Sequence, residues 1–149
     1  MIATVLLLVS FPFVQTPAPA NAACALLNTA QVTSLIGAAQ TIPISNAAAK
    51  GSACMLQNGD KVITVLLSTQ DTAAAAKDLF ERKKRIVSGE AIAGWTLPSY
   101  AGSMKPDASV VGFVNGQTFT EVKMIDKAAY PEGALTKLKA VMKDVAAKK

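Results

Sequence analysis

The chain of 149 residues contains no histidine, two cysteines and few aromatic residues. Without histidine it lacks the base of Ser-His-Asp and Cys-His catalytic sites and the commonest metal-binding side chain. No G-x-G-x-x-G or Walker pattern occurs, and the acidic residues are not spaced as in a calcium loop. The sequence therefore indicates no catalytic residue, no metal site and no cofactor, and it favours a non-enzymatic protein.

Two short patterns resemble fragments of catalytic sites. Ser103 lies two residues from Lys105, but closeness in sequence does not place the two side chains in contact. Asp78 and Glu81 have basic neighbours on an expected helix, where such carboxylates are ordinary surface partners rather than a glycosidase pair. An uncharacterised hydrolase is therefore the third hypothesis for function, behind two kinds of binding protein.

The N-terminal segment predicts export. Residues 2–14 are uncharged and mostly apolar, a run shorter than the roughly 20 residues of a membrane span but suited to the about 7–15 residues of a signal-peptide core. A proline-rich stretch follows, and Ala20-Asn21-Ala22 is an A-x-A cleavage site. We expect a signal peptide over residues 1–22 and one domain over residues 23–149, without a transmembrane span, in the periplasm or outside the cell.

Two features of this leader leave alternatives open. No lysine or arginine precedes the apolar run, so Met1 as the true start is an open question and a buried N-terminal strand is the competing structure. Acylation at Cys24 would make the chain a lipoprotein, but Asn21 rather than leucine stands three residues before that cysteine.

Cys24 and Cys54 are expected to form a disulfide bond, because an even number of cysteines in an exported chain is typical of one. The bond would fasten the N-terminal segment to the sheet. In the loop-entropy model, closing a loop of about 30 residues stabilises a fold by roughly 3–4 kcal/mol. A pair of redox thiols is the alternative, but the spacing is not C-x-x-C.

Positive charge gathers in two segments, residues 71–87 and 132–149, within a net formal charge of +5. Four consecutive cations interrupt the apolar stripe of the first segment and are the candidate anion-binding residues: Arg82, Lys83, Lys84 and Arg85. At least one of them must lay its methylene stem along apolar surface with its charge in water. The bias favours anionic partners, but two solvated helix faces of a soluble exported protein are the preferred explanation. Recognition of a specific nucleic acid is not expected.

Two Asn-Gly pairs, Asn58-Gly59 and Asn115-Gly116, predict two β-hairpins with type I′ turns. The expected strands cover residues 52–57, 61–68, 109–114 and 117–125. A two-residue Asn115-Gly116 turn pairs Phe113 with Thr118, and it places Glu121 and Lys123 on a wet face.

Three helices are expected around the hairpins. Asn28 and Gln31 form a capping box before the first. Asp71 caps the second, over residues 72–87, and Pro131 begins the third, which runs to about residue 147. Residues 40–51 are expected to be a loop, and residues 90–107 an irregular segment with a short strand near residues 99–103.

Trp95 and Tyr100 lie in that irregular segment and are the candidate ligand-loop aromatics. Aromatic side chains on loops can line a ligand site. A lone tryptophan beside a sheet more often closes the end of a core, and that is the competing interpretation.

Several short motifs resemble the DUF3558-like family of small exported bacterial domains of unknown function. They are Cys24-Ala25-Leu26-Leu27, Thr29-Ala30-Gln31-Val32, Leu35-Ile36-Gly37 and Ser52-Ala53-Cys54. The later hairpin and C-terminal helix are also similar, and the chain departs at Ile92-Ala93-Gly94-Trp95, where the family often has a Gly-Leu-Gly-Asp-type turn. The resemblance implies the fold and an envelope or secreted location, and adds little about chemistry.

Together these features predict an α+β fold in the order α-ββ-α-(β)-ββ-α, with an antiparallel sheet and helices packed on one face. The leading hypothesis is an exported binding or accessory module with an envelope protein or another macromolecule as partner. A cationic domain that binds an anionic polymer or lipid surface is the alternative. Basic residues of two helices on a shared face would favour the cationic domain, whereas an apolar groove between helix and sheet would favour a ligand or peptide binder.

Overall fold

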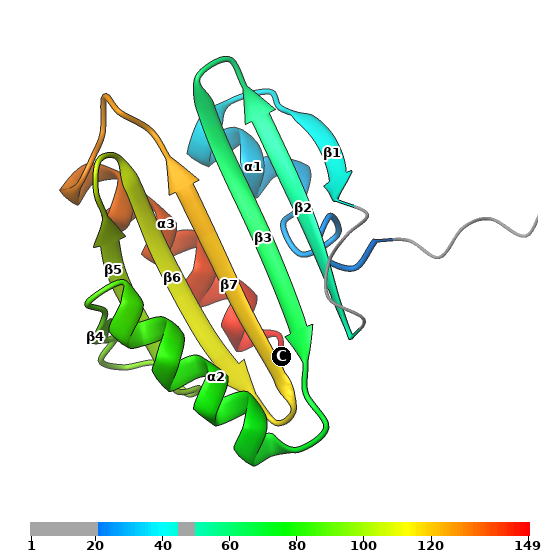
Figure 1. Ribbon diagram of the computed structural model, residues 1–149. Coiled ribbons are helices and arrows are strands. Elements are labelled where there is room, and N and C mark those ends of the chain that lie inside the picture. The colour runs from blue at the N-terminus through cyan, green and yellow to red at the C-terminus, as the bar shows by residue number, and fades with distance from the viewer. Residues whose placement is uncertain (1–20, 45–49) are drawn as a thin grey trace, which may run out of the picture.

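The structure, a computed structural model, describes residues 21–44 and 50–149. Along the chain the elements are α1 (Thr29–Ile36), β1 (Gln40–Ile44), β2 (Gly51–Asn58), β3 (Lys61–Thr69), α2 (Ala73–Ile86), β4 (Glu90–Ala91), β5 (Ser99–Met104), β6 (Ala108–Asn115), β7 (Thr118–Ile125) and α3 (Glu132–Ala147). The strands form one sheet in the order β1-β2-β3-β7-β6-β5-β4, and every neighbouring pair is antiparallel (Figure 1).

The predicted α+β class and both hairpins are confirmed, as β2–β3 and β6–β7. The short strand expected near residues 99–103 is β5. Edge strand β1 was not predicted, because Pro43 within it indicated a loop. Proline cannot donate a ladder hydrogen bond and is accommodated at a sheet edge, which is where β1 lies.

The turns of both hairpins differ from the type I′ geometry that the Asn-Gly pairs predict. Asn58 and Asn115 are the last residues of their strands, and each glycine therefore takes the first central position of its turn. Gly59 has φ of +60° and Gly116 has φ of +55°, whereas the residue after each does not have positive φ. A glycine at the first central position with positive φ is typical of a type II′ turn.

This change of turn moves the register of the second hairpin. Phe113 pairs with Thr120 rather than with Thr118. Because the partner moves by two residues, every side chain stays on the face that was expected for it. Asn58 was expected at a central position of the turn. It instead ends β2, and its side chain donates a hydrogen bond of 2.6 Å to the carbonyl of Ile36 at the end of α1.

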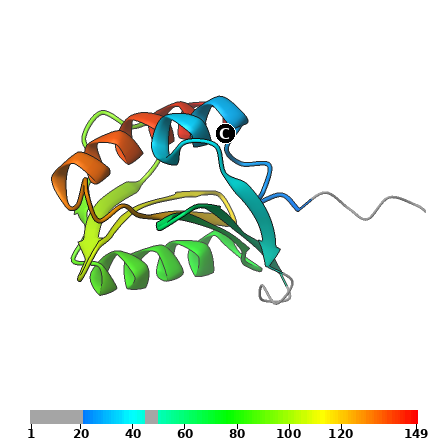
Figure 2. The same cartoon turned by 90° about the horizontal axis from the view of Figure 1, so that it is seen from above.

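The helices pack on both faces of the sheet, and the expectation that they share one face is wrong. Figure 2 shows α1 and α3 on one side and α2 on the other. Strand β6 explains this arrangement, because it is buried on both sides. Its Val111 and Phe113 belong to the core beneath α1 and α3, whereas Val110 and Val114 belong to a second core beneath α2. A strand with two apolar faces needs a cover on each.

Local signals fix the starts of α1 and α2. The capping box of Asn28 and Gln31 is confirmed, with two hydrogen bonds of 2.9 Å. Thr72 rather than Asp71 caps α2, because its hydroxyl accepts from the amide of Ala75 at 3.1 Å. The carboxylate of Asp71 instead forms an ion pair with Lys50.

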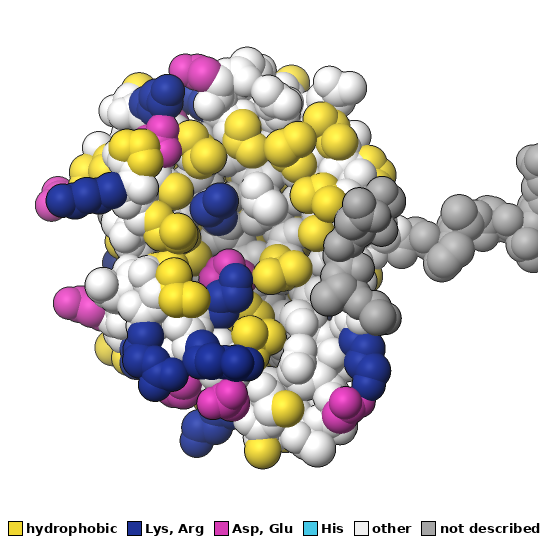
Figure 3. All heavy atoms as spheres, in the orientation of Figure 1, with side chains coloured by type: hydrophobic (Ala, Val, Ile, Leu, Met, Phe, Trp, Pro, Cys, Tyr) yellow, Lys and Arg dark blue, Asp and Glu magenta, His cyan; other side chains and the backbone are white. Residues whose placement is uncertain are grey.

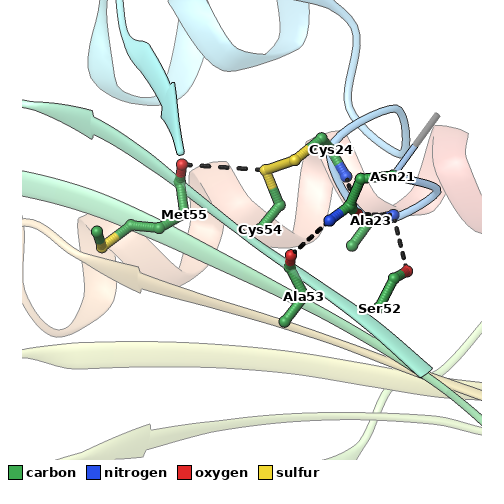
Figure 4. Close-up of a disulfide and its surroundings, with 7 residues drawn as sticks. All are labelled: Asn21, Ala23, Cys24, Ser52, Ala53, Cys54 and Met55. Carbon is green, nitrogen blue, oxygen red and sulfur yellow. Dashed lines mark hydrogen bonds between the residues drawn. A yellow bond between two sulfur atoms is a disulfide. The ribbon is translucent and has the colours of Figure 1, made fainter. Parts of the chain in front are cut away.

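The Cys24–Cys54 disulfide is confirmed, with Cα atoms 5.0 Å apart. It joins the segment before α1 to the middle of β2 (Figure 4). Asn21 strengthens this junction: its side-chain amide donates to the carbonyl of Ala53 at 3.0 Å, and its oxygen accepts from the amides of Ala23 and Cys24 at 3.0 and 3.2 Å.

Residues 1–20 of the expected signal peptide lie outside the described residues. Asn21 and Ala22 are described, and they belong to the folded junction. Cleavage after Ala22 stays a prediction. Such cleavage would remove the three side-chain hydrogen bonds of Asn21 and place the new amino terminus at Ala23, which is fully buried.

Candidate functional site

On its α2 side, the sheet is only half covered. Helix α2 packs over β5, β6 and β7, and no helix in the described part of the chain covers β1, β2 and β3 on that side (Figures 1 and 2). We call this uncovered area, with the adjoining side of β7, the open face. Alternation along the strands and their pairing assign these side chains to it: Ile42, Ile44, Ala53, Met55, Thr64, Leu66, Glu121 and Lys123.

A groove of about 250 Å³ lies where the open face meets the end of α2. Its lining residues come from the sheet and from the last turn of the helix: Ala53, Thr64, Leu66, Lys83, Ile86, Val87, Met104, Glu121 and Lys123. Ile86 is 67% exposed, and no other large hydrophobic residue among those that the structure describes is exposed. Figure 3 shows hydrophobic side chains across the open half of the sheet and basic side chains along α2.

One row of residues across the sheet positions the carboxylate of this groove. Tyr100, Gly112 and Glu121 are direct neighbours on β5, β6 and β7. A Cβ atom on Gly112 would lie only 2.5 Å from the ring of Tyr100. The ring therefore occupies the space that a side chain at Gly112 would take, and the Tyr100 hydroxyl reaches across to donate a hydrogen bond of 2.6 Å to Glu121.

Glu121 has a second partner from the helix. The ammonium of Lys83 lies 3.6 Å from its carboxylate, and the two side chains are 32% and 15% exposed. Tyr100 itself is fully buried. Burial raises the pKa of Tyr100 far above its ordinary value, and the negative charge of Glu121 and the hydrogen bond to it act in the same direction.

This arrangement predicts how stability depends on pH. In the unfolded chain Tyr100 loses its proton near about pH 10, whereas in the folded protein it keeps it. The stabilising effect is therefore complete below about pH 10, and the free energy of unfolding falls above it by up to about 1.4 kcal/mol per pH unit. Urea unfolding of the wild type and of Tyr100→Phe at several alkaline pH values measures this slope. Equal slopes in the two proteins would contradict it.

Lys123 brings a further positive charge to the groove. It lies across from Thr64 on β3 and is half-buried. Unlike Lys83, it makes no ion pair within 4.0 Å among residues 21–44 and 50–149. The groove thus combines apolar walls with two lysines and one carboxylate that is already bonded.

The structure separates the four candidate anion-binding residues. Lys83 lines the groove, where it pairs with Glu121. Arg82 is exposed and pairs with Asp78 at 3.3 Å. Lys84 is half-buried and Arg85 exposed. Their binding of an anion stays a prediction, but the four do not form one cluster.

The lysines of α3 lie on the opposite side of the sheet, so the basic residues of the two helices do not share a face.

Trp95 and Tyr100 do not form one aromatic patch. Trp95 is half-buried against the core on the α1 and α3 side. Tyr100 lies in strand β5 rather than in a loop, within the core under α2, and its placement as a ligand-loop residue is wrong. Trp95 contacts the core as the competing interpretation expected.

Glu121, Lys123 and Ile86 are the groove residues that the sequence analysis missed as a site. Glu121 and Lys123 were expected on a wet face, and Ile86 was expected within the apolar stripe of α2. The predicted type I′ register places Phe119 rather than Glu121 across from Gly112, so the sequence carried no signal for the position of Glu121 beside this glycine. The pairing of β5 beside Gly112 could not be inferred locally.

Within the described ranges, no cluster of three or more acidic, cysteine or histidine residues is placed to hold a metal ion. No helix there is long and apolar enough to span a membrane. Comparisons with protein-family models, with curated proteins and with solved structures gave no match for this chain.

Proposed function

We propose that the chain is an exported, non-enzymatic binding module that holds an apolar ligand in the groove and on the open face. The observation that carries this proposal is the uncovered apolar half of the sheet, which is bounded by the exposed Ile86 and hollowed into the groove at the end of α2. Exposed apolar surface of this kind commonly marks a binding site.

Three further features support the exported part of the proposal. The disulfide is of the kind that persists in oxidising compartments. The apolar leader with its A-x-A site and the resemblance of the opening motifs to exported domains point the same way. The basic residues of α2 and α3 lie on opposite sides of the sheet and form no shared cationic face. This separation, together with the groove, favours a ligand-binding module over a domain that binds an anionic surface.

A neutral, environment-sensitive dye such as Nile red tests the proposal. We expect the wild type to bind it and to increase its fluorescence, and Ile86→Ser to bind it about tenfold or more weakly, since burying an isoleucine side chain contributes about 1.5–3 kcal/mol. Ile86 is exposed in the free protein, so the substitution should leave stability nearly unchanged.

The matched control is Ala140→Ser, which introduces serine at an exposed position of α3, on the other side of the sheet. It should bind the dye as the wild type does. Absence of dye binding by the wild type, or equal binding by Ile86→Ser, would overturn the proposal.

A further inference from the structure

We propose that the ligand is a single-chain aliphatic amphiphile with a carboxylate head group, which Lys123 binds while the chain lies along the open face. This inference rests on the proposed function and adds the chemistry of the ligand to it. The head group and the chain are each matched by a different part of the site.

The charges of the groove specify the head group. Three charged side chains line the groove, and they are Lys83, Glu121 and Lys123. Glu121 already accepts from the Tyr100 hydroxyl at 2.6 Å and pairs with Lys83 at 3.6 Å. A cationic ligand would therefore have to displace bonds that are already made, whereas an anion meets the unpaired ammonium of Lys123.

The position of Lys123 suits this role because apolar residues lie in the same row. Its direct neighbours are Val110 on β6 and Thr64 on β3, and Met55 lies beyond Thr64 on β2. The side chain of Lys123 is half-buried, so its methylene stem is partly ordered before a ligand arrives. A charge-assisted hydrogen bond at a partly desolvated site is stronger than one in open water.

An apolar track leads away from this head-group position. The row of Glu121 continues to Leu66, Ala53 and Ile44, and the row of Lys123 continues to Met55 and Ile42. From β7 to β1 this track crosses three strand spacings, about 14 Å at about 4.8 Å each. Apart from Thr64, the residues that follow Glu121 and Lys123 in these two rows are apolar, so an aliphatic chain fits the track better than a polar one.

The size of the groove favours one chain over two. Its volume of about 250 Å³ lies below the roughly 300–1,000 Å³ of pockets that enclose a whole drug-sized ligand. It can take a head group and the first part of a chain, with the remainder on the open face. An extended peptide added to the edge of β1 fits less well, because Pro43 there has no amide hydrogen to donate.

The test compares decanoate with 1-decanol, which share a chain length and differ in charge. We expect both to displace Nile red from the wild type and decanoate to bind at least about tenfold more tightly, as one charge-assisted hydrogen bond predicts. Lys123→Gln should remove that preference, so that decanoate binds no more tightly than 1-decanol. The control, Lys143→Gln on the exposed side of α3, should keep it. The preference should also weaken as salt rises.

The outcomes separate this inference from the proposed function. If both compounds bind equally to the wild type, the open face binds apolar chains but the head-group assignment is wrong. A preference that survives in Lys123→Gln equally overturns the role of Lys123. Failure of both compounds to bind overturns the proposed function as well. Binding to anionic phospholipid vesicles without binding to monomeric decanoate would replace the inference with a membrane-surface site.

Discussion

Phe80→Ala is expected to lower the free energy of unfolding by about 3–5 kcal/mol, as removal of a buried aromatic side chain typically does. Phe80 is 3% exposed, and its ring centroid lies 5.2 Å from that of Tyr100 and 6.4 Å from that of Phe119. It is one of two buried residues on α2, and the other is Ala76. Phe80 therefore supplies most of the apolar contact that holds this helix on the sheet.

Urea unfolding of the wild type, of Phe80→Ala and of Ile86→Ala measures the effect. Ile86 belongs to the same helix but is exposed, and its replacement should change stability by less than about 0.5 kcal/mol. A loss below about 1 kcal/mol in Phe80→Ala would show that other contacts hold α2. Because α2 forms one wall of the groove, the variant should also bind Nile red more weakly than the wild type does.

Replacing both cysteines with alanine is expected to cost about 3–4 kcal/mol, because the unfolded chain gains the freedom of an open loop. The two residues are 30 apart in sequence, and their bond joins the segment before α1 to β2. Reduction of the wild-type disulfide should have a similar effect, since both treatments open the same loop.

The matched measurements are urea unfolding of Cys24→Ala/Cys54→Ala and of the wild type with and without reductant. A cost below about 1 kcal/mol in both would contradict the loop argument. Ligand binding by the folded fraction should persist in the double variant, because Cys54 faces the core under α1 and α3 and the groove is on the other side of the sheet.

The elements that the sequence predicted correctly are those with local causes. The capping box of Asn28 and Gln31 needs only four consecutive residues. Each hairpin needs a turn glycine between two apolar runs, so the pairs β2–β3 and β6–β7 could be found even though the turn type was wrong. The disulfide followed from the number of cysteines and the exported character of the chain.

The layering of the helices could not be predicted in the same way. It depends on which strands have two buried faces, and in β6 the second face includes Gly112, which gives no hydrophobic signal. The structure explains the glycine, because the ring of Tyr100 fills the space that a side chain at Gly112 would occupy. The pairing of β5 with β6 is what brings them together.

The candidate site shows the same limit. The basic run of α2 was visible in the sequence, but the sequence did not show that Lys83 alone among the four lines the groove. Glu121 and Lys123 were correctly placed on one face of a hairpin. Both side chains are half-buried at the edge of α2 rather than fully exposed to solvent. Their burial depends on how α2 packs across the sheet, which is a tertiary property.

The most direct test of the binding site is amide chemical-shift mapping of the folded protein during titration with decanoate. The account predicts that the largest shifts occur at Leu66, Ile86 and Lys123 and at their neighbours on β2, β3, β7 and the end of α2. Shifts confined to α1 and α3, or no shifts at concentrations where decanoate is monomeric, would contradict the assignment of the open face as the binding site.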